Sequence, residues 1–295
     1  MLLAGCMVPS VDYSIPEWPA EKPDVVIIGF AGRCNLLKAC KSPEQNRAYL
    51  SETPYPNTLG ALEAEFRQLG YSTLSFSYRS HFMVNEWGPG YLAAANLLER
   101  VKREWIDGQD NPTRVVLVSH SHGTQFMSLL AWDHPDVTFD YAIYLDAVCL
   151  TWDQAHGPWL QAVYGSVDAY PEPLPQTGGV ACDSLDVPGL GAEDISDIVP
   201  WNVIYGVEVL SGGMILPGLV ADNDPNHRPD GSTGLAAGLI GLRIGEQHLE
   251  VRSDQSAAID WVLQIIAENG LPDRSSHMIA PVVPDGFELA TSPAR

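Results

Sequence analysis

Val116-Leu117-Val118-Ser119-His120-Ser121-His122-Gly123 is the stretch of sequence that decides the fold. Its aliphatic residues are typical of a strand buried on both faces, and residues 124–132 are typical of a helix. A tight turn from strand to helix around a serine brings the positions two before and two after that serine into contact, so both must be small. Ser119 and Gly123 meet this demand. The segment therefore predicts a sharp strand–turn–helix with the Ser121 hydroxyl exposed at its tip.

Short apolar runs and amphipathic segments alternate along the rest of the chain. Elements that alternate in this way form parallel strands connected by helices that pack on the faces of the sheet. The sequence therefore predicts an α/β fold with a mostly parallel central sheet and helices on both faces. The predicted strands cover residues 24–32, 72–78, 113–118, 141–145 and 203–207, with 241–245 as the last strand or its approach; the predicted helices cover residues 57–70, 90–106, 124–132 and 256–269.

Three segments depart from this alternation. Residues 1–22 include a stretch rich in Pro and polar residues, which indicates an N-terminal tether. Residues 151–200 combine many Pro and Gly residues with several aromatic ones, which indicates a cap-like insertion. Residues 271–295 are Pro-rich and indicate a C-terminal tail. We therefore expect a single domain over residues 23–270 that carries the insertion.

The size and composition exclude several classes of protein. The chain has 295 residues, of which 45% are hydrophobic, so it can bury a sizeable core. This excludes a disordered chain, a collagen-like chain and a small scaffold that depends on disulfides. No apolar run reaches the ~18 residues that a membrane-spanning helix needs, so we do not expect an integral membrane protein.

The charge is strongly acidic, with 37 Asp and Glu against 16 Lys and Arg and a formal net charge of -21. A nucleic-acid partner would require a basic patch that displaces counterions. The longest cluster of cations is Arg100, Lys102 and Arg103 on one predicted helix. We therefore expect no nucleic-acid partner and a surface that repels anionic substrates.

Five cysteines bear on the cellular compartment. Leu3-Ala4-Gly5-Cys6 is similar to the lipobox of bacterial lipoproteins, whose cysteine is lipidated after signal cleavage. A signal peptide needs an apolar segment before that cysteine, so either the natural start lies upstream or the match is coincidental. A lipidated Cys6 would leave four thiols for up to two disulfides in an oxidising compartment, with three pairings open. These four are Cys34, Cys40, Cys149 and Cys182.

The alternative for these cysteines is four buried free thiols in a cytoplasmic enzyme. We favour export to the periplasm, the cell surface or the extracellular medium. Anchoring to a membrane is expected only through a lipidated Cys6.

A serine hydroxyl needs a base to become a nucleophile at neutral pH. His120 and His122 are too closely tied to the turn to reach round to Ser121. In hydrolases built on parallel sheets the chain order is serine, acid, histidine, which favours His248, in a polar turn before the last helix. The competitors are His227, in a polar loop, and His277, in the tail.

The third group of such a site is a carboxylate that orients the imidazole. Asp146 ends a buried strand at the same edge of the sheet as Ser121, so it is well placed for this role. Glu208 follows the next strand of the main alternation and is an alternative acid. Asp222 and Asp224 are further alternatives.

The developing negative charge on the substrate requires two backbone N–H donors. One comes from the residue after the nucleophile, which is His122, and the other from the loop after an earlier strand. Residues 29–32, Gly-Phe-Ala-Gly, form that loop, and we expect Phe30 to supply the second N–H of the oxyanion hole.

These motifs resemble the α/β-hydrolase fold superfamily over about residues 23–270. Residues 119–123 match its nucleophile turn, with Ser119 where the family usually has Gly. Residues 28–32 are similar to its oxyanion loop, with Ile28 where the family usually has His. Residues 144–147 are similar to the strand-end acid of pancreatic-type lipases, which favours Asp146 over Glu208. The resemblance implies hydrolysis of a carboxylic ester through an acyl-enzyme, without metal or organic cofactor.

Other motifs carry less weight. Residues 222–230 contain several acids in a spacing similar to a Ca²⁺ loop, but Pro225 falls where such a loop must bend and no Glu stands at the twelfth position. No phosphate-binding Gly loop or dinucleotide fingerprint is present. We therefore expect neither a metal nor a cofactor.

Taken together, the sequence predicts a serine esterase or lipase that acts on a small-molecule or lipid ester. Two alternatives stay open. An amide, thioester or peptide hydrolase of the same fold would carry the same residues, because the choice of leaving group depends on the shape of the pocket. A binding protein that has the fold but no activity is the other alternative.

Overall fold

The computed structural model describes residues 18–32, 48–81, 90–149, 185–187, 191–212, 214–216, 219–220 and 225–275. Residues 1–17 of the expected tether, 151–184 and 188–190 of the expected insertion and 276–295 of the expected tail lie outside these residues.

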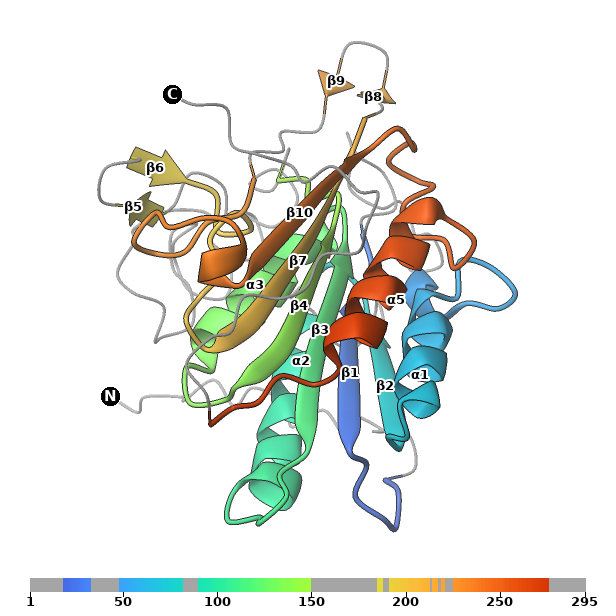
Figure 1. The fold of residues 1–295 in the computed structure, drawn as a ribbon, viewed down its shortest axis with the longest axis vertical. Coiled ribbons are helices and arrows are strands. Elements are labelled where there is room, and N and C mark those ends of the chain that lie inside the picture. The colour runs from blue at the N-terminus through green and yellow to red at the C-terminus, as the bar shows by residue number, and fades with distance from the viewer. Residues whose placement is uncertain are drawn as a thin grey trace, which may run out of the picture.

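Six parallel strands form the central sheet, and the prediction of a parallel α/β sheet is confirmed (Figure 1). Their spatial order is β10-β7-β4-β3-β1-β2. Every neighbouring pair in this order runs parallel. The strands are β1 (Val25–Phe30), β2 (Thr73–Tyr78), β3 (Arg114–His120), β4 (Phe139–Leu145), β7 (Val203–Ser211) and β10 (Leu239–Ile244).

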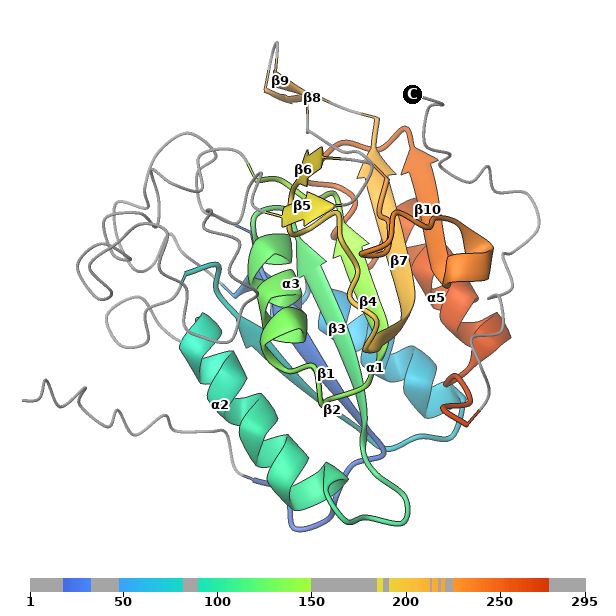
Figure 2. The same ribbon diagram turned by 90° about the vertical axis from the view of Figure 1, so that its left-hand side faces the viewer.

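Helices of the described chain cover both faces of the sheet (Figures 1 and 2). On one face α2 (Tyr91–Val101) and α3 (Gly123–Asp133) bury Leu97, Phe126 and Leu130 against β1, β3 and β4. On the other face α1 (Thr58–Gln68) and α5 (Ala257–Asn269) bury Leu62 and Ile266. Because side chains alternate along a strand, each buried strand contributes to both cores. This burial on both faces explains why β1, β3 and β4 read as continuous apolar runs.

The short elements lie outside the sheet. Two antiparallel pairs are formed by β5 (Leu185–Val187) with β6 (Gly191–Glu193) and by β8 (Met214–Leu216) with β9 (Leu219–Val220). Single helical turns are η2 (Tyr49–Ser51), η3 (Lys102–Ile106) and η4 (Leu235–Ala237). Within the part of the chain that the structure describes, no helix is long and apolar enough to cross a membrane.

Two elements differ most from their predicted extent. The helix predicted over 90–106 ends as an α-helix at Val101 and continues through the π-helical turn η3. The strand predicted over 203–207 continues as β7 to Ser211. This extension carries Ser211 to the carboxyl end of the sheet, where it contacts the candidate site.

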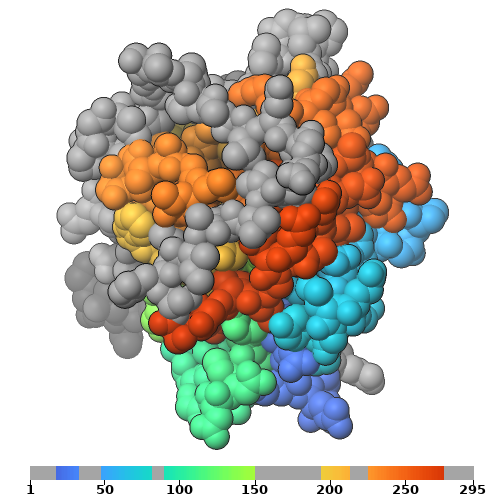
Figure 3. Space-filling view, in the orientation of Figure 1, coloured from blue at the N-terminus to red at the C-terminus, as the bar shows by residue number. Residues whose placement is uncertain are grey.

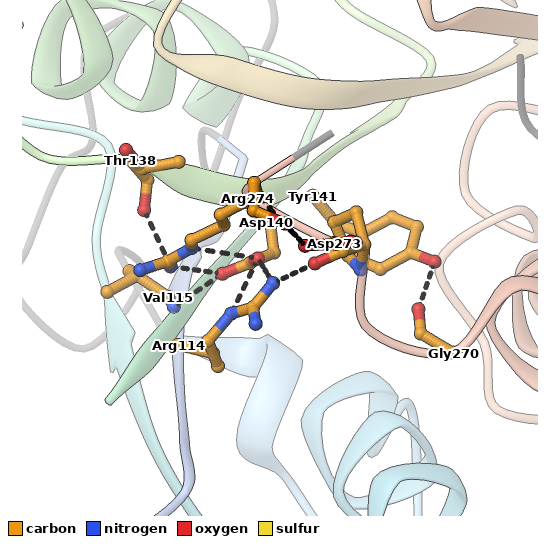
Figure 4. Close-up of polar contacts among 10 residues, drawn as sticks. Arg114, Val115, Thr138, Asp140, Tyr141, Gly270, Asp273 and Arg274 are labelled. Atoms are coloured by element: carbon orange, nitrogen blue, oxygen red, sulfur yellow. Dashed lines mark hydrogen bonds and ion pairs between the residues drawn. The ribbon is translucent and has the colours of Figure 1, made fainter. Parts of the chain in front are cut away.

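The C-terminal part of the described chain lies on the surface. Figure 3 shows α5 and the red segment after it beside the cyan residues of α1. Beyond α5, Arg274 donates to Asp140 at the start of β4, and Arg114 at the start of β3 donates to the same carboxylate (Figure 4). This contact fixes the chain at the amino ends of the strands, opposite the edge that carries the candidate site.

Candidate active site

Ser121 lies in the turn between β3 and α3, at the carboxyl edge of the sheet. Its φ is 57°, in the left-handed region that side-chain-bearing residues rarely adopt. The backbone N–H of Ser121 donates to the Leu145 carbonyl at 3.0 Å, which ties the turn to the neighbouring strand β4. The predicted strand–turn–helix is therefore present, with Ser121 held at its tip, but Ser121 is buried, at 3% exposure, and not exposed as predicted.

The turn leaves no room for side chains at its small positions. A Cβ added to Gly123 would lie 2.3 Å from the Phe30 carbonyl oxygen and 2.7 Å from that of Ala31. A Cβ on Gly32 would lie 2.7 Å from the Cβ of Ser121. The end of β1 and the start of α3 therefore pack backbone to backbone around the serine.

His248 lies in the loop between β10 and α5 and is fully buried. Its Nε2 is 2.8 Å from the Ser121 Oγ, and its Nδ1 is 2.5 Å from the Asp146 Oδ2. An ionised carboxylate only accepts hydrogen bonds, so the proton resides on Nδ1 and Nε2 accepts from the Ser121 hydroxyl. The structure thus brings the three predicted residues together in the order serine, imidazole, carboxylate.

The loop that presents His248 is anchored at both sides. Glu246 accepts hydrogen bonds from the N–H groups of Ala257 (2.8 Å) and Ala258 (3.1 Å) in the first turn of α5. At the same helix, Ser256 is the N-cap and accepts from the Ile259 N–H at 3.1 Å. These contacts satisfy helix N–H groups that have no partner within the helix and fix the approach of His248 to the sheet.

Asp146 follows β4 and is completely buried, with a φ of 51°. Ser211, at the end of β7, donates to both carboxylate oxygens, from its backbone N–H at 2.8 Å and from its hydroxyl at 2.6 Å. Sequence reasoning missed Ser211 because the predicted strand ended at residue 207. A small polar residue ending the strand next to the acid would have been the signal.

The other candidate residues are placed elsewhere. Glu208 accepts a hydrogen bond from the Asn226 N–H at 2.9 Å, whereas it is Asp146 that bonds His248. His227 directs its Nδ1 to the Arg228 carbonyl at 3.0 Å. Asp222, Asp224 and His277 lie outside the described residues.

His122 is the N-cap of α3, so its backbone N–H lies at the positive end of a helix next to Ser121. Its role as the first oxyanion donor stays a prediction. The side chain is buried, and its Nδ1 donates to the Val148 carbonyl at 3.2 Å.

The position of Phe30 disagrees with the prediction that its N–H is the second donor. Phe30 is the last residue of β1 and pairs with both β2 and β3. The N–H of the next residue, Ala31, donates to Tyr78 of β2 at 2.8 Å. Successive N–H groups of a central strand alternate between its two neighbours, so the Phe30 N–H points to β3 inside the sheet. Phe30 is therefore still part of β1, where residues 29–32 were expected to form the oxyanion loop.

Of the predicted cysteines only Cys149 lies among the described residues. It is disulfide-bonded and follows the site segment that contains Asp146 and Val148. Cys6, Cys34, Cys40 and Cys182 lie outside the described residues. Among the residues that are described, no group of three or more His, Cys, Asp or Glu side chains is arranged to hold a metal ion.

The architecture is the α/β-hydrolase fold. A parallel sheet with helices on both faces, whose central strand β3 leads through a serine turn into a helix, defines that fold. The resemblance inferred from the sequence is therefore confirmed for the fold. The further likeness of the acid position to that of pancreatic-type lipases stays a prediction.

No protein-family model matches the sequence, and no curated protein sequence matches it. Solved structures with a similar chain path include an arylesterase (14% identity, 84% of this chain and 77% of that chain, TM-score 0.41). Est1E from Butyrivibrio proteoclasticus is 12% identical over 84% of this chain and 88% of that chain, with a TM-score of 0.38. An extracellular alpha/beta-hydrolase from a Paenibacillus species is 12% identical over 82% of this chain and 98% of that chain, with a TM-score of 0.36. Likenesses at this level say nothing about the substrate.

Proposed function

We propose that this protein is a serine hydrolase that cleaves carboxylic esters through an acyl-enzyme. The observation that carries the proposal is the continuous hydrogen-bonded series from the Ser121 hydroxyl through His248 to Asp146, at 2.8 and 2.5 Å. Distances of this size are within the reach that a general base needs to take the proton of its nucleophile.

In the first half-reaction the Ser121 oxygen attacks the ester carbonyl while its proton passes to the His248 Nε2. The resulting imidazolium is stabilised by Asp146, which stays ionised. The tetrahedral intermediate collapses when the carbon–oxygen bond to the alcohol breaks and His248 returns the proton to that alcohol. Water then repeats the sequence on the acyl-enzyme, releasing the acid and regenerating Ser121.

The N–H of His122 supports the oxygen that becomes negative in both intermediates. A backbone donor at a helix N-terminus is fixed before the reaction, so it need not reorganise as charge develops. The net charge of -21 favours esters that carry no negative charge, since an acidic surface raises the energy of an approaching anion.

The proposal is tested with a panel of p-nitrophenyl esters and the matching anilides. We expect ester turnover by the wild type, and a loss of at least ~10³-fold in kcat for Ser121→Ala and for His248→Ala. Asp146→Asn should lose more activity than Glu208→Gln, and the reverse order would contradict the choice of acid. Cleavage of anilides faster than esters would favour an amide hydrolase, and a folded wild type without any turnover would favour a binding protein.

We also infer that the chain works in an oxidising compartment. The disulfide at Cys149 supports this inference, because such bonds are rare where thiols are kept reduced. Intact-mass analysis after alkylation, with and without prior reduction, should show additional alkylated thiols only after reduction. Full alkylation of all five cysteines in the native, unreduced protein would contradict it.

A further inference from the structure

A second buried imidazole lies beside the candidate site. His120 is the last residue of β3, directly before Ser121, and is 1% exposed. Its ring centroid is 4.7 Å from that of His248. Yet its Nε2 contacts the backbone carbonyl oxygen of His248, at 2.8 Å, and not the Ser121 hydroxyl. The ring is therefore outside the proton path of the proposed reaction.

The partners of His120 fix where its proton resides. A carbonyl oxygen only accepts, so the Nε2 carries the proton and donates to His248. The Nδ1 then accepts from the Tyr49 hydroxyl, which lies within hydrogen-bond reach of it. The Tyr49 oxygen in turn accepts from the Gly32 N–H at 2.5 Å. The series therefore runs from the Gly32 N–H through Tyr49 and His120 to the His248 carbonyl, and each donor in it has one acceptor.

The surroundings keep both side chains neutral. Burial, and then the neighbouring His248, hold the pKa of His120 well below its usual value. Burial raises the pKa of Tyr49 to about 12, although the Arg252 guanidinium, 4.1 Å from the Tyr49 ring centroid, acts in the opposite direction. The phenol therefore keeps its proton and His120 stays uncharged at neutral pH, as this series of hydrogen bonds requires.

Both ends of the series lie at the reacting centre. Gly32 packs against Ser121, because an added Cβ there would lie 2.7 Å from the serine Cβ. The carbonyl at the other end belongs to His248 itself. The loop after β1 and the loop after β10 come from distant parts of the sequence, and the Tyr49–His120 pair joins them by hydrogen bonds.

We propose that His120 and Tyr49 are positioning residues, which hold Gly32 against the nucleophile and hold the backbone of His248 at the distance from which its ring reaches Ser121. The expected effect on reaction rate rests on the proposed function. The placement of Gly32 and of the His248 backbone by these two residues does not depend on it. Displacements of about 1 Å at a reacting centre reduce rates by up to ~10²-fold.

The test combines fluorophosphonate labelling of Ser121 with proton NMR of the His248–Asp146 hydrogen bond. We expect His120→Phe and Tyr49→Phe each to slow labelling by ~10- to 100-fold, to lower kcat and to leave KM within about twofold. Because the two residues act in one series, the double variant should be no slower than the slower single variant. His120→Gln places an amide donor near the Nε2 position, so it should recover most of the labelling rate, whereas His120→Asn should not.

The matched controls are His134→Phe and Tyr141→Phe, which remove hydrogen bonds to the Leu130 and Gly270 carbonyls away from the site. Both controls should label at the wild-type rate. A folded His120→Phe that labels at the wild-type rate, or effects of Tyr49→Phe and His120→Phe that multiply, would overturn the proposal.

The NMR measurement separates this proposal from the proposed function. The low-field proton between His248 and Asp146 should be sharp in the wild type and in His120→Gln, and broadened by exchange in His120→Phe. If the wild type neither labels nor hydrolyses esters, the proposed function fails, while the change in this resonance still decides the positioning role. An unchanged resonance in His120→Phe would refute that role.

Discussion

At the scale of single residues, two backbone conformations mark the site. Ser121 and Asp146 follow adjacent strands, and both have φ in the left-handed region, at 57° and 51°. Such conformations cost ~1–3 kcal/mol for residues with side chains and persist only where the surroundings hold them. Here the Ser121 N–H bonds Leu145 and the Asp146 N–H bonds Val209, at 3.0 and 2.7 Å. The strain therefore coincides with the two residues whose side chains must meet His248.

Ser211 offers a test of how much the orientation of the acid contributes. Ser211→Ala removes the hydroxyl that donates to Asp146 and keeps the backbone N–H, so we expect kcat to fall about tenfold, the equivalent of ~1.4 kcal/mol. Steady-state ester kinetics would measure this. Ser72→Ala is the matched control, because Ser72 makes the same hydroxyl–carboxylate bond to Asp24, at 2.7 Å, at the opposite edge of the sheet. An equal loss in both variants would contradict the role of Ser211.

At the scale of elements, the close packing of α3 against β1 determines the shape of the turn. Gly123→Ala would place a methyl group 2.3 Å from the Phe30 carbonyl oxygen, so we expect a loss of about 1–3 kcal/mol in the free energy of unfolding and a large loss of fluorophosphonate labelling. The matched control is Gly245→Ala, because a Cβ added at Gly245 has no heavy atom within 4 Å. It should leave the free energy of unfolding and the labelling unchanged. Denaturant unfolding together with labelling measures both, and a stable, reactive Gly123→Ala would show that the turn is looser than described.

The contact between α2 and α3 predicts a dependence of stability on pH. The Tyr91 hydroxyl donates to Asp133, whose Oδ1 is buried without a hydrogen-bond partner among the described residues. Burial raises the pKa of Asp133 to about 7 from 3.8. The folded state therefore binds this proton more tightly than the unfolded state, and the associated stability is lost as pH rises from about 4 through about 7.

Asp133→Asn removes that dependence. Relative to wild type, we expect the variant to gain at least about 1 kcal/mol of stability at pH 8 and to gain little at pH 4. Thermal unfolding of both proteins across this range provides the measurement. A constant difference at all pH values would rule out titration of Asp133 as the cause.

The helices and strands show how much of the fold can be predicted from the sequence. The strands of the central sheet and the described helices that pack on it are readable because burial on both faces gives continuous apolar runs and burial on one face gives a helical period. The exact ends of strands are less readable: β7 continues through Val209 and Leu210 to Ser211, beyond its predicted end at residue 207, and β1 still includes Phe30, which lies in the segment expected to form the oxyanion loop. The role expected of the Phe30 N–H failed for this reason, since the pairing of a strand end depends on its neighbours in space.

At the scale of the whole molecule, Asp140 is the contact that fixes the far edge. Its carboxylate is completely buried and accepts from Arg114, Arg274 and the Val115 N–H (Figure 4). We expect Asp140→Asn to lower the free energy of unfolding by about 3 kcal/mol, because two guanidinium groups lose a buried charge partner. Glu63→Gln, which breaks the exposed ion pair with Arg67, should cost less than ~0.5 kcal/mol.

Neither variant should change kcat for the folded protein, because both lie away from the site. Chemical denaturation and ester kinetics on the same samples would establish this, and a fall in kcat for Asp140→Asn would mean that the two edges of the sheet are coupled.

The candidate site, too, could be predicted from the sequence only in part. The chain order and the positions at strand ends predicted that Ser121, Asp146 and His248 lie close together, because the carboxyl ends of parallel strands meet at one edge of the sheet. Tyr49 could not be found in this way. It lies in the single helical turn η2, which has no periodic pattern, and its contact with His120 spans 71 positions of the sequence.

The central claim is that Ser121 is a nucleophile activated by His248, and the most direct measurement is intact-mass analysis after reaction with a fluorophosphonate, with the modified peptide mapped. We predict one adduct per chain, located on Ser121, which is absent in Ser121→Ala and forms at least ~10³-fold more slowly in His248→Ala. An adduct on another residue, or a folded wild type that gains no mass, would contradict the claim.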